Sequence, residues 1–250
     1  HFLFALLMAA TDGILSNAVL MALKDFAAID WHLTIPRVVS GVGMIATLWI
    51  GNWMLSRPKM PFVQTMGIIV TVCCFAMAAS TTAFAFLGFL GIAETCLYMR
   101  LPALGAIIRL SYPATQRGRV TGEIRRWCSV VFLVSALGTA VALDSAGDHS
   151  YLLIRALVLL AGILNLFSLV VVRRVRVKEA TASQSSTLTT IVSDTYTHTK
   201  QVLLHDYRFR HYLAGFCFFI FSSLLCMPFV PAILMSELHL GYLGTALLLH

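Results

Sequence analysis

Residues 60–93 read MPFVQTMGIIVTVCCFAMAASTTAFAFLGFLGIA and contain no charged side chain. A helix needs about 20 residues to cross about 30 Å of hydrocarbon, so this stretch is too long for a single crossing. Its one polar cluster is Ser80-Thr81-Thr82. We therefore expect a hairpin of two membrane helices that turns at this cluster, with one span over 62–80 and the next over 84–110.

The rest of the 250-residue chain has the same character. It is 59% hydrophobic and 12% charged, whereas an ordinary globular domain is about 25% charged. A soluble fold could not cover so much apolar surface with so few polar side chains. The composition therefore excludes a conventional cytosolic enzyme, a disulfide-rich secreted domain and a disordered chain, and it indicates a lipid bilayer as the main partner.

Further apolar runs bring the predicted number of spans to eight. Tyr112-Pro113 ends the fourth span, because proline cannot continue the helical hydrogen bonds, and a basic loop up to Trp127 leads to the fifth. Each span is expected to be helical, since an open strand would leave backbone groups unpaired in lipid. The fold class is thus all-α and polytopic. The other six spans are 2–23, 35–56, 128–143, 151–172, 211–235 and 241–250, the last cut short.

Lysine and arginine side chains gather on one side of this topology. The connections after the second, fourth and sixth spans carry 14 of the 18 cations. The positive-inside rule places that side, and the start of the chain, in the cytoplasm of a cell-membrane protein. A net charge of +7 would suit nucleic acid in a soluble protein, but these cations flank runs too long to be cores, so no nucleic-acid partner is expected.

The chain divides into three parts. Residues 1–172 form a six-helix transmembrane half, 173–210 a cytoplasmic connection, and 211–250 the truncated start of a second half. Within the connection, apolar residues between Leu188 and Leu203 recur at helical spacing, which favours an amphipathic helix lying on the membrane interface. A disordered tether is the alternative.

This organisation resembles the major facilitator superfamily. The segment YPATQRGRVTG (112–122) is similar to the basic loop after the fourth helix of many members. Residues 51–59 occupy the place of the family's signature loop, with Leu55 where the family has an acid. Arg100 resembles the family's membrane arginine, although Gly105 stands one residue too far away, and the proline-glycine motif of the fifth helix is absent.

The resemblance implies a twelve-helix protein of two halves, of which this chain holds the first half and the start of the second. It also implies a secondary transporter, a symporter or uniporter, that moves a small solute by alternating access around a site near mid-membrane. A gradient of the solute or of protons would drive it. The rival functions are an integral-membrane enzyme acting on lipid and a channel or non-transporting helical membrane protein.

Asp12, Glu94 and Arg100 are the ionisable residues expected deep inside spans, where each costs about 2.5–3.5 kcal/mol on insertion scales. Asp12 and Glu94 each lie about ten residues into their spans, or about 15 Å deep. Two acids at one depth can carry protons, because a carboxyl group removed from water holds a proton more readily. Glu94 and Arg100 are six residues apart, about 240° around the helix, so they should point to different faces unless Pro102 bends it.

In the resembled family the first and fourth helices line the central cavity. The resemblance therefore implies that Asp12, Glu94 and Arg100 bind the solute or couple protons, with Asn17 and Tyr98 beside them. The alternative for Glu94 and Arg100 is a pair with another helix that only holds the bundle together. For Asn17 and Tyr98 the structural role is favoured.

Charged residues on the cytoplasmic side are candidates for a gate. Glu123 stands four residues after Arg119 and three before Arg126, a spacing that allows ion pairs, although such groups are more often a solvated helix start. Small residues in the patterns Ser135xxxThr139 and Gly138xxxAla142 favour close helix approach. The gate candidates are Arg57, Lys59, Arg117, Arg119, Glu123 and Arg126.

Motifs for enzymes and cofactors give no support to a catalytic role. Residues 41–46 match the dinucleotide pattern GxGxxA, but they lie within a span, with no preceding strand and no acid about 20 residues later. The histidines have no metal-ligand spacing, and the sequence lacks a P-loop, an HExxH motif and a GxSxG motif. We therefore expect a non-enzymatic protein with no cofactor and no metal.

Overall fold

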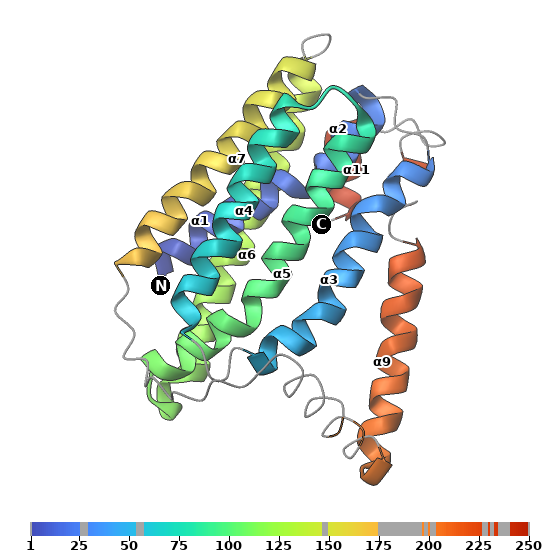
Figure 1. The fold of residues 1–250 in the computed structure, drawn as a ribbon. Coiled ribbons are helices and arrows are strands. Elements are labelled where there is room, and N and C mark those ends of the chain that lie inside the picture. The colour runs from blue at the N-terminus through green and yellow to red at the C-terminus, as the bar shows by residue number, and fades with distance from the viewer. Residues whose placement is uncertain are drawn as a thin grey trace.

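A computed structural model describes residues 2–25, 30–53, 58–146, 150–174, 204–226 and 241–249, together with residues 197, 200, 230, 233 and 234. All of its regular elements in these ranges are helical, and none of the described residues forms a strand (Figure 1). The elements are α1 (Phe2–Ser16), α2 (Ala18–Asp25), the short 3-10 helix η1 (Asp30–Leu33), α3 (Thr34–Trp53), α4 (Lys59–Ala79), α5 (Ala83–Ser111), α6 (Ala114–Ala146), α7 (Ser150–Arg173), α9 (Tyr207–Cys226) and α11 (Tyr242–Leu249).

Within the described ranges, five helical segments are long and apolar enough to cross a membrane. They are Phe2–Ala22, which joins α1 to α2, and the four helices α4, α5, α6 and α7. Their outward faces carry large apolar side chains, such as Val72, Phe84 and Phe167, that are more than half exposed. A soluble protein would bury such side chains, whereas lipid accommodates them. The chain is a multi-pass helical membrane protein in character.

The expected hairpin at residues 80–82 is confirmed. Helix α4 ends at Ala79 and α5 begins at Ala83. The Ser80 hydroxyl donates to the Met77 carbonyl oxygen at 2.7 Å, and the Thr82 hydroxyl accepts from the Ala85 backbone N–H at 3.3 Å. The small polar side chains thus satisfy backbone groups that the two helix ends leave without intrahelical partners.

The expected basic loop before Trp127 is wrong. Residues from Ala114 onward are helical, and α6 runs for 33 residues to Ala146, about 50 Å. Charged side chains make a segment leave the hydrocarbon, but arginine, glutamine and glutamate are good helix formers and do not end a helix. The break comes instead at Tyr112-Pro113, where the backbone of Tyr112 is extended.

The other expected spans agree with the structure to different degrees. The first is interrupted at Asn17, which separates α1 from α2. The seventh begins four residues earlier than expected, at Tyr207, and its described helix ends at Cys226. The short eighth helix is α11. Most of the expected interfacial helix between Leu188 and Leu203 lies outside the described residues, which there include positions 197 and 200 alone.

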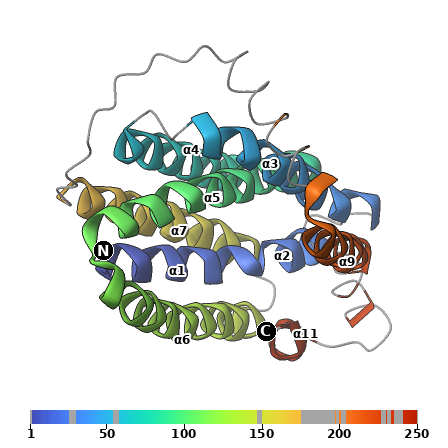
Figure 2. The same ribbon diagram turned by 90° about the horizontal axis from the view of Figure 1, so that it is seen from below.

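Helix packing brings α5 into the centre of the bundle. It packs against α3 and α4, while α7 packs against α4 and α1, and α6 packs against α1 on the other side. Figure 2 shows this order from α3 and α4 through α5 to α7, α1 and finally α6. A large buried cluster, which includes Phe86 and Tyr242, fills the space between these helices, and a smaller one forms around Phe4 and Ile107.

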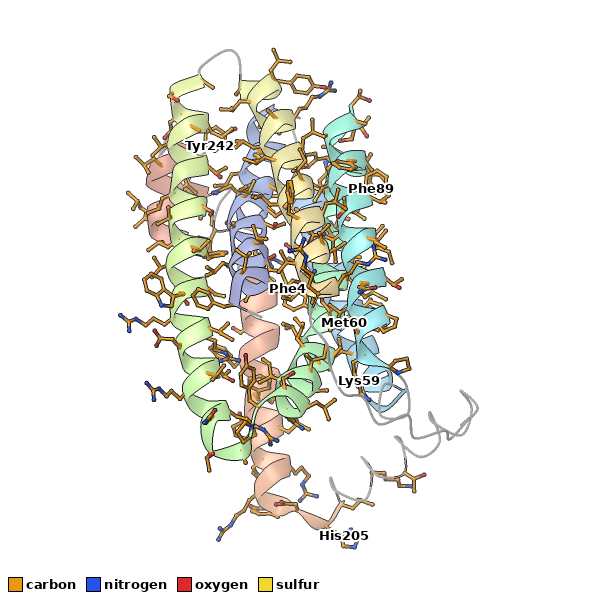
Figure 3. The ribbon with its side chains drawn as sticks, turned by 90° about the vertical axis from the view of Figure 1, so that its left-hand side faces the viewer. Phe4, Lys59, Met60, Phe89, His205 and Tyr242 are labelled. Atoms are coloured by element: carbon orange, nitrogen blue, oxygen red, sulfur yellow. The ribbon has the colours of Figure 1, made fainter. Side chains whose placement is uncertain are left out.

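The bundle has two distinct ends. We call the end that holds Lys59 and the Ser111–Pro113 turn the cation-rich end. The opposite end holds the Ser80–Thr82 turn and the start of α7. Figure 3 places Lys59 and His205 at the cation-rich end, and places Tyr242, beside α6, toward the opposite end.

A close approach between α1 and α6 depends on Gly13. A Cβ atom at this position would lie 2.5 Å from the Phe132 carbonyl oxygen and 2.8 Å from the Ser135 Cβ atom. Thr139, one turn after Ser135, is 4% exposed. The first of the two small-residue patterns therefore marks the contact, whereas Gly138 has no atom within 4 Å of an added Cβ.

Replacing Gly13 with alanine should destabilise the bundle, because the backbone of α6 cannot move aside as a flexible side chain could. We expect a loss of about 1–3 kcal/mol, the usual cost of overpacking, seen as a lower midpoint of thermal unfolding in detergent. Gly138→Ala is the matched control and should be neutral or slightly stabilising, since alanine favours a helix over glycine. Equal loss in both variants would contradict this account of the contact.

Candidate functional site

Three ionisable side chains lie near the middle of their helices. Asp12 is the central residue of the Phe2–Ala22 span. Glu94 and Arg100 stand three residues on either side of the midpoint of α5, which covers Ala83–Ser111, or about 4.5 Å from it along the axis. All three are therefore far from the aqueous ends of the bundle.

Arg100 is fully buried between α4, α5 and α7. Its Nη1 atom donates to the Asn165 Oδ1 atom at 3.4 Å. The Asn165 amide nitrogen in turn donates to the Gly67 carbonyl oxygen at 2.7 Å and to the Thr71 hydroxyl at 2.9 Å. This network joins three helices, yet the Nε and Nη2 atoms of Arg100 have no hydrogen-bond partner among the described residues.

Glu94 faces α3 instead. Its carboxylate lies 3.9 Å from the Arg37 guanidinium, and the Ser40 hydroxyl adjoins the same carboxylate. The next residue, Thr95, donates to the Val39 carbonyl oxygen at 3.0 Å. Glu94 and Arg100 thus contact different neighbouring helices, as their angular separation on α5 requires.

Asp12 has no such partner. Its Oδ1 atom is buried and makes no hydrogen bond within the described part of the chain. Arg100 is near enough to attract the carboxylate electrostatically, but no ion pair within 4 Å joins the two side chains. Glu94 Oε2 also makes no hydrogen bond, but it has the ion pair with Arg37, whereas Asp12 has none among the described residues. A buried carboxylate without a partner is costly.

Asp12 also lines an open cavity of about 480 Å³ between α1 and α6. The α6 wall is built from residues spaced as one face of a helix. This face runs from the membrane middle toward the cation-rich end. The lining residues are Ala9 and Asp12 from α1, and Arg125, Cys128, Ser129, Phe132 and Leu133 from α6.

Asn17 and Tyr98 occupy different surroundings. Asn17 is fully buried at the break between α1 and α2, and its amide nitrogen donates to the Ala136 carbonyl oxygen of α6 at 2.9 Å. It thereby anchors the break to α6. Tyr98 is half-buried one turn from Glu94, so it belongs with Glu94 and Arg37 rather than with the cavity.

The structure does not bring the gate candidates together. Arg117 holds the C-terminal end of α5, where its Nε and Nη2 atoms donate to the carbonyl oxygens of Tyr112 and Arg109 at 2.8 and 2.7 Å. Glu123 lies 4.0 Å from Arg126, but their side chains are 57% and 72% exposed, so the pair contributes little. Arg119 is exposed on α6, Lys59 begins α4, and Arg57 lies outside the described residues.

Two important residues were not expected to belong to this region. Asn165 is the only carboxamide in the apolar run 151–172, and a lone amide in such a run is a signal for a polar contact between helices. Arg37 was expected near a loop. Its place in the first turn of α3 leaves a long side chain that can reach inward to Glu94.

Comparisons with known proteins do not identify the chain. A scan against models of known protein families found no match, and a search of curated proteins found none either.

Among the described residues, no group of three histidine, cysteine, aspartate or glutamate side chains could hold a metal ion.

Asn165→Ala should destabilise the protein, because it removes the acceptor of the buried Arg100 guanidinium and the donor to the Gly67 carbonyl oxygen and the Thr71 hydroxyl. Each unsatisfied buried group costs about 1–3 kcal/mol, which should appear as a lower unfolding temperature in detergent. Ser168→Ala is the matched control on the same helix, since Ser168 donates only to the Asn165 carbonyl oxygen of its own helix. If both variants unfold at the same temperature as the parent, the hydrogen bonds of Asn165 do not stabilise the protein.

Proposed function

We propose that this protein is a secondary transporter of the major facilitator type that moves a small solute by alternating access. The observation that carries the proposal is the Asp12 carboxylate, which lies at the middle of a membrane bundle, has no hydrogen bond at Oδ1, and forms part of an open cavity. An ionisable group in this position is expensive, so its presence favours a role in the passage of a solute or an ion.

Asp12 is the proposed coupling residue. When the cavity is empty, a proton is the simplest way to remove the cost of its buried charge. A bound solute changes that cost, so solute and proton become linked at one carboxyl group. Glu94 and Arg100 are less suited to this role, because Arg37 and Asn165 already contact them.

The break in the first span supports the same proposal. Asn17 lies five residues from Asp12, between α1 and α2, and interrupted helices beside a mid-membrane site are common in transporters. A break of this kind gives the end of α1 a place to bend while α2 stays packed.

A contact at the opposite end supports alternating access. The Asp144 carboxylate of α6 accepts hydrogen bonds from the backbone N–H groups of Tyr242 and Leu243, at 2.8 and 2.7 Å. Its negative charge also suits the N-terminus of α11. A rocking motion of the two halves would break this contact and expose the opposite end, while the cation-rich end closes.

Transport can be tested in proteoliposomes that contain a pH-sensitive dye and face a panel of amino acids, sugars, organic cations and organic anions. We expect one class to accumulate or to move protons. Asp12→Asn should reduce the proton-coupled flux at least tenfold, on the order expected for loss of an essential proton carrier. Asp206→Asn, an exposed acid at the cation-rich end, is the control and should leave the flux unchanged.

Two outcomes would contradict this proposal in different ways. Unchanged pH-dependent uptake by the Asp12→Asn variant would make Asp12 a structural residue. A steady ion current without any solute would favour a channel instead.

Orientation has its own test. With the native cysteines replaced, Ser145→Cys should react with an impermeant thiol reagent added to intact cells, because Ser145 is exposed at the opposite end, on the side proposed to face outward. Ser111→Cys, exposed at the cation-rich end, should react only after the membrane is permeabilised. The reverse pattern would overturn the proposed orientation.

A further inference from the structure

The cavity beside Asp12 has charges of opposite sign at its two ends. Gly13 lies against Phe132 across the α1–α6 contact, so the neighbouring Asp12 is level with this part of α6. Arg125 precedes Phe132 by seven residues, or about 10 Å along the helix axis. The cavity therefore has a carboxylate at the membrane middle and a guanidinium nearer the cation-rich end.

Neither charged group has a hydrogen bond or an ion pair with another described side chain, and of the two Asp12 is buried at Oδ1 whereas Arg125 is exposed. The Asp12 Oδ1 atom has no hydrogen-bond partner, and the structure shows no hydrogen bond or ion pair of the Arg125 guanidinium with any described residue. The adjacent arginine differs, since Arg126 lies near Glu123. A ligand that brings one charge of each sign could satisfy both ends at once.

The wall between the two charges is mixed. Ala9, Phe132 and Leu133 offer apolar contact, while the Ser129 hydroxyl donates to the Arg125 carbonyl oxygen at 3.0 Å. Cys128 is half-buried in the same wall. This arrangement suits a short carbon chain or a ring between two charged groups rather than a uniformly polar molecule.

We propose that the cavity binds a zwitterionic solute, with its ammonium group toward Asp12 and its acidic group toward Arg125. This inference rests on the proposed transport function and names the class of solute. A simple cation would leave Arg125 without a partner and would be repelled by it. A simple anion would meet the same problem at Asp12, and a neutral sugar would bring no opposite charge to the buried Asp12 carboxylate or to Arg125.

Cys128 provides a native reporter of occupancy. The test uses the full chain in lipid nanodiscs with Cys217 and Cys226 replaced by serine, and it follows alkylation of Cys128 by N-ethylmaleimide. Three probes of similar length are compared: 6-aminohexanoate, hexylammonium and hexanoate. We expect 6-aminohexanoate to slow alkylation at a concentration about tenfold or more below that of either singly charged probe, as loss of one charged hydrogen bond implies.

Single substitutions assign each end. Asp12→Asn should weaken protection by 6-aminohexanoate and by hexylammonium, and it should not weaken protection by hexanoate. Arg125→Gln should weaken protection by 6-aminohexanoate and hexanoate, and it should not weaken protection by hexylammonium. Arg109→Gln removes an exposed arginine of α5 outside the cavity lining, and it should change none of the three. The comparison of probes on the protein with Asp12 and Arg125 intact does not depend on how any of these variants folds.

The possible failures are distinguishable. Equal protection by hexylammonium or hexanoate alone would overturn the zwitterion assignment and leave the transport proposal intact. Proton-coupled uptake of another solute class, without protection of Cys128 by any probe, would also overturn the zwitterion assignment and leave the transport proposal intact. Absence of both uptake and protection would overturn the zwitterion assignment and the transport function together.

Discussion

The hydrocarbon of a bilayer offers no water to solvate a charged or polar group, and this constraint governs the whole structure. Backbone groups meet it by forming helices throughout the described residues. Side chains meet it through partners on neighbouring helices. Asn165 shows the principle, because one carboxamide on α7 forms hydrogen bonds with polar groups on two other helices, α4 and α5. Because of the same requirement, a buried ionisable group without a partner points to a function rather than to stability.

The buried ionisable residues separate into two kinds on this basis. Glu94 and Arg100 each have one protein partner, Arg37 and Asn165, and these contacts join α5 to α3 and α7, although Glu94 Oε2 and Arg100 Nε and Nη2 make no hydrogen bond among the described residues. Asp12 stands in an open cavity with an unsatisfied oxygen atom. The first kind stabilises the bundle, whereas the second leaves a buried negative charge that a solute or a proton can neutralise. The proposed function and the proposed class of solute both follow from this difference.

Much of the fold could be predicted from the sequence, because length and hydropathy decide where a chain can cross lipid. The uncharged stretch 60–93 specified the hairpin, and its polar cluster marked the turn. The start of α6 could not be predicted in this way, since charged residues show where a helix leaves the lipid but not where the helix itself begins or ends. Composition also does not show which residue is the partner of a given buried polar group. The pairing of Arg100 with Asn165 depends on which faces of α5 and α7 meet, and Arg117 proved to hold the end of α5, a contact that hydropathy does not encode.

The account depends most on the claim that the surroundings of Asp12 are an aqueous cavity within the membrane rather than lipid. Water accessibility of a single cysteine tests it directly, because methanethiosulfonate reagents react with the hydrated thiolate. In a background without native cysteines, Asp12→Cys should react readily with a small charged methanethiosulfonate in nanodiscs. Val72→Cys, on an exposed apolar face near the middle of α4, should remain unreactive. Equal inertness of both cysteines would contradict the account, because Asp12 would then face no water and could exchange neither proton nor solute.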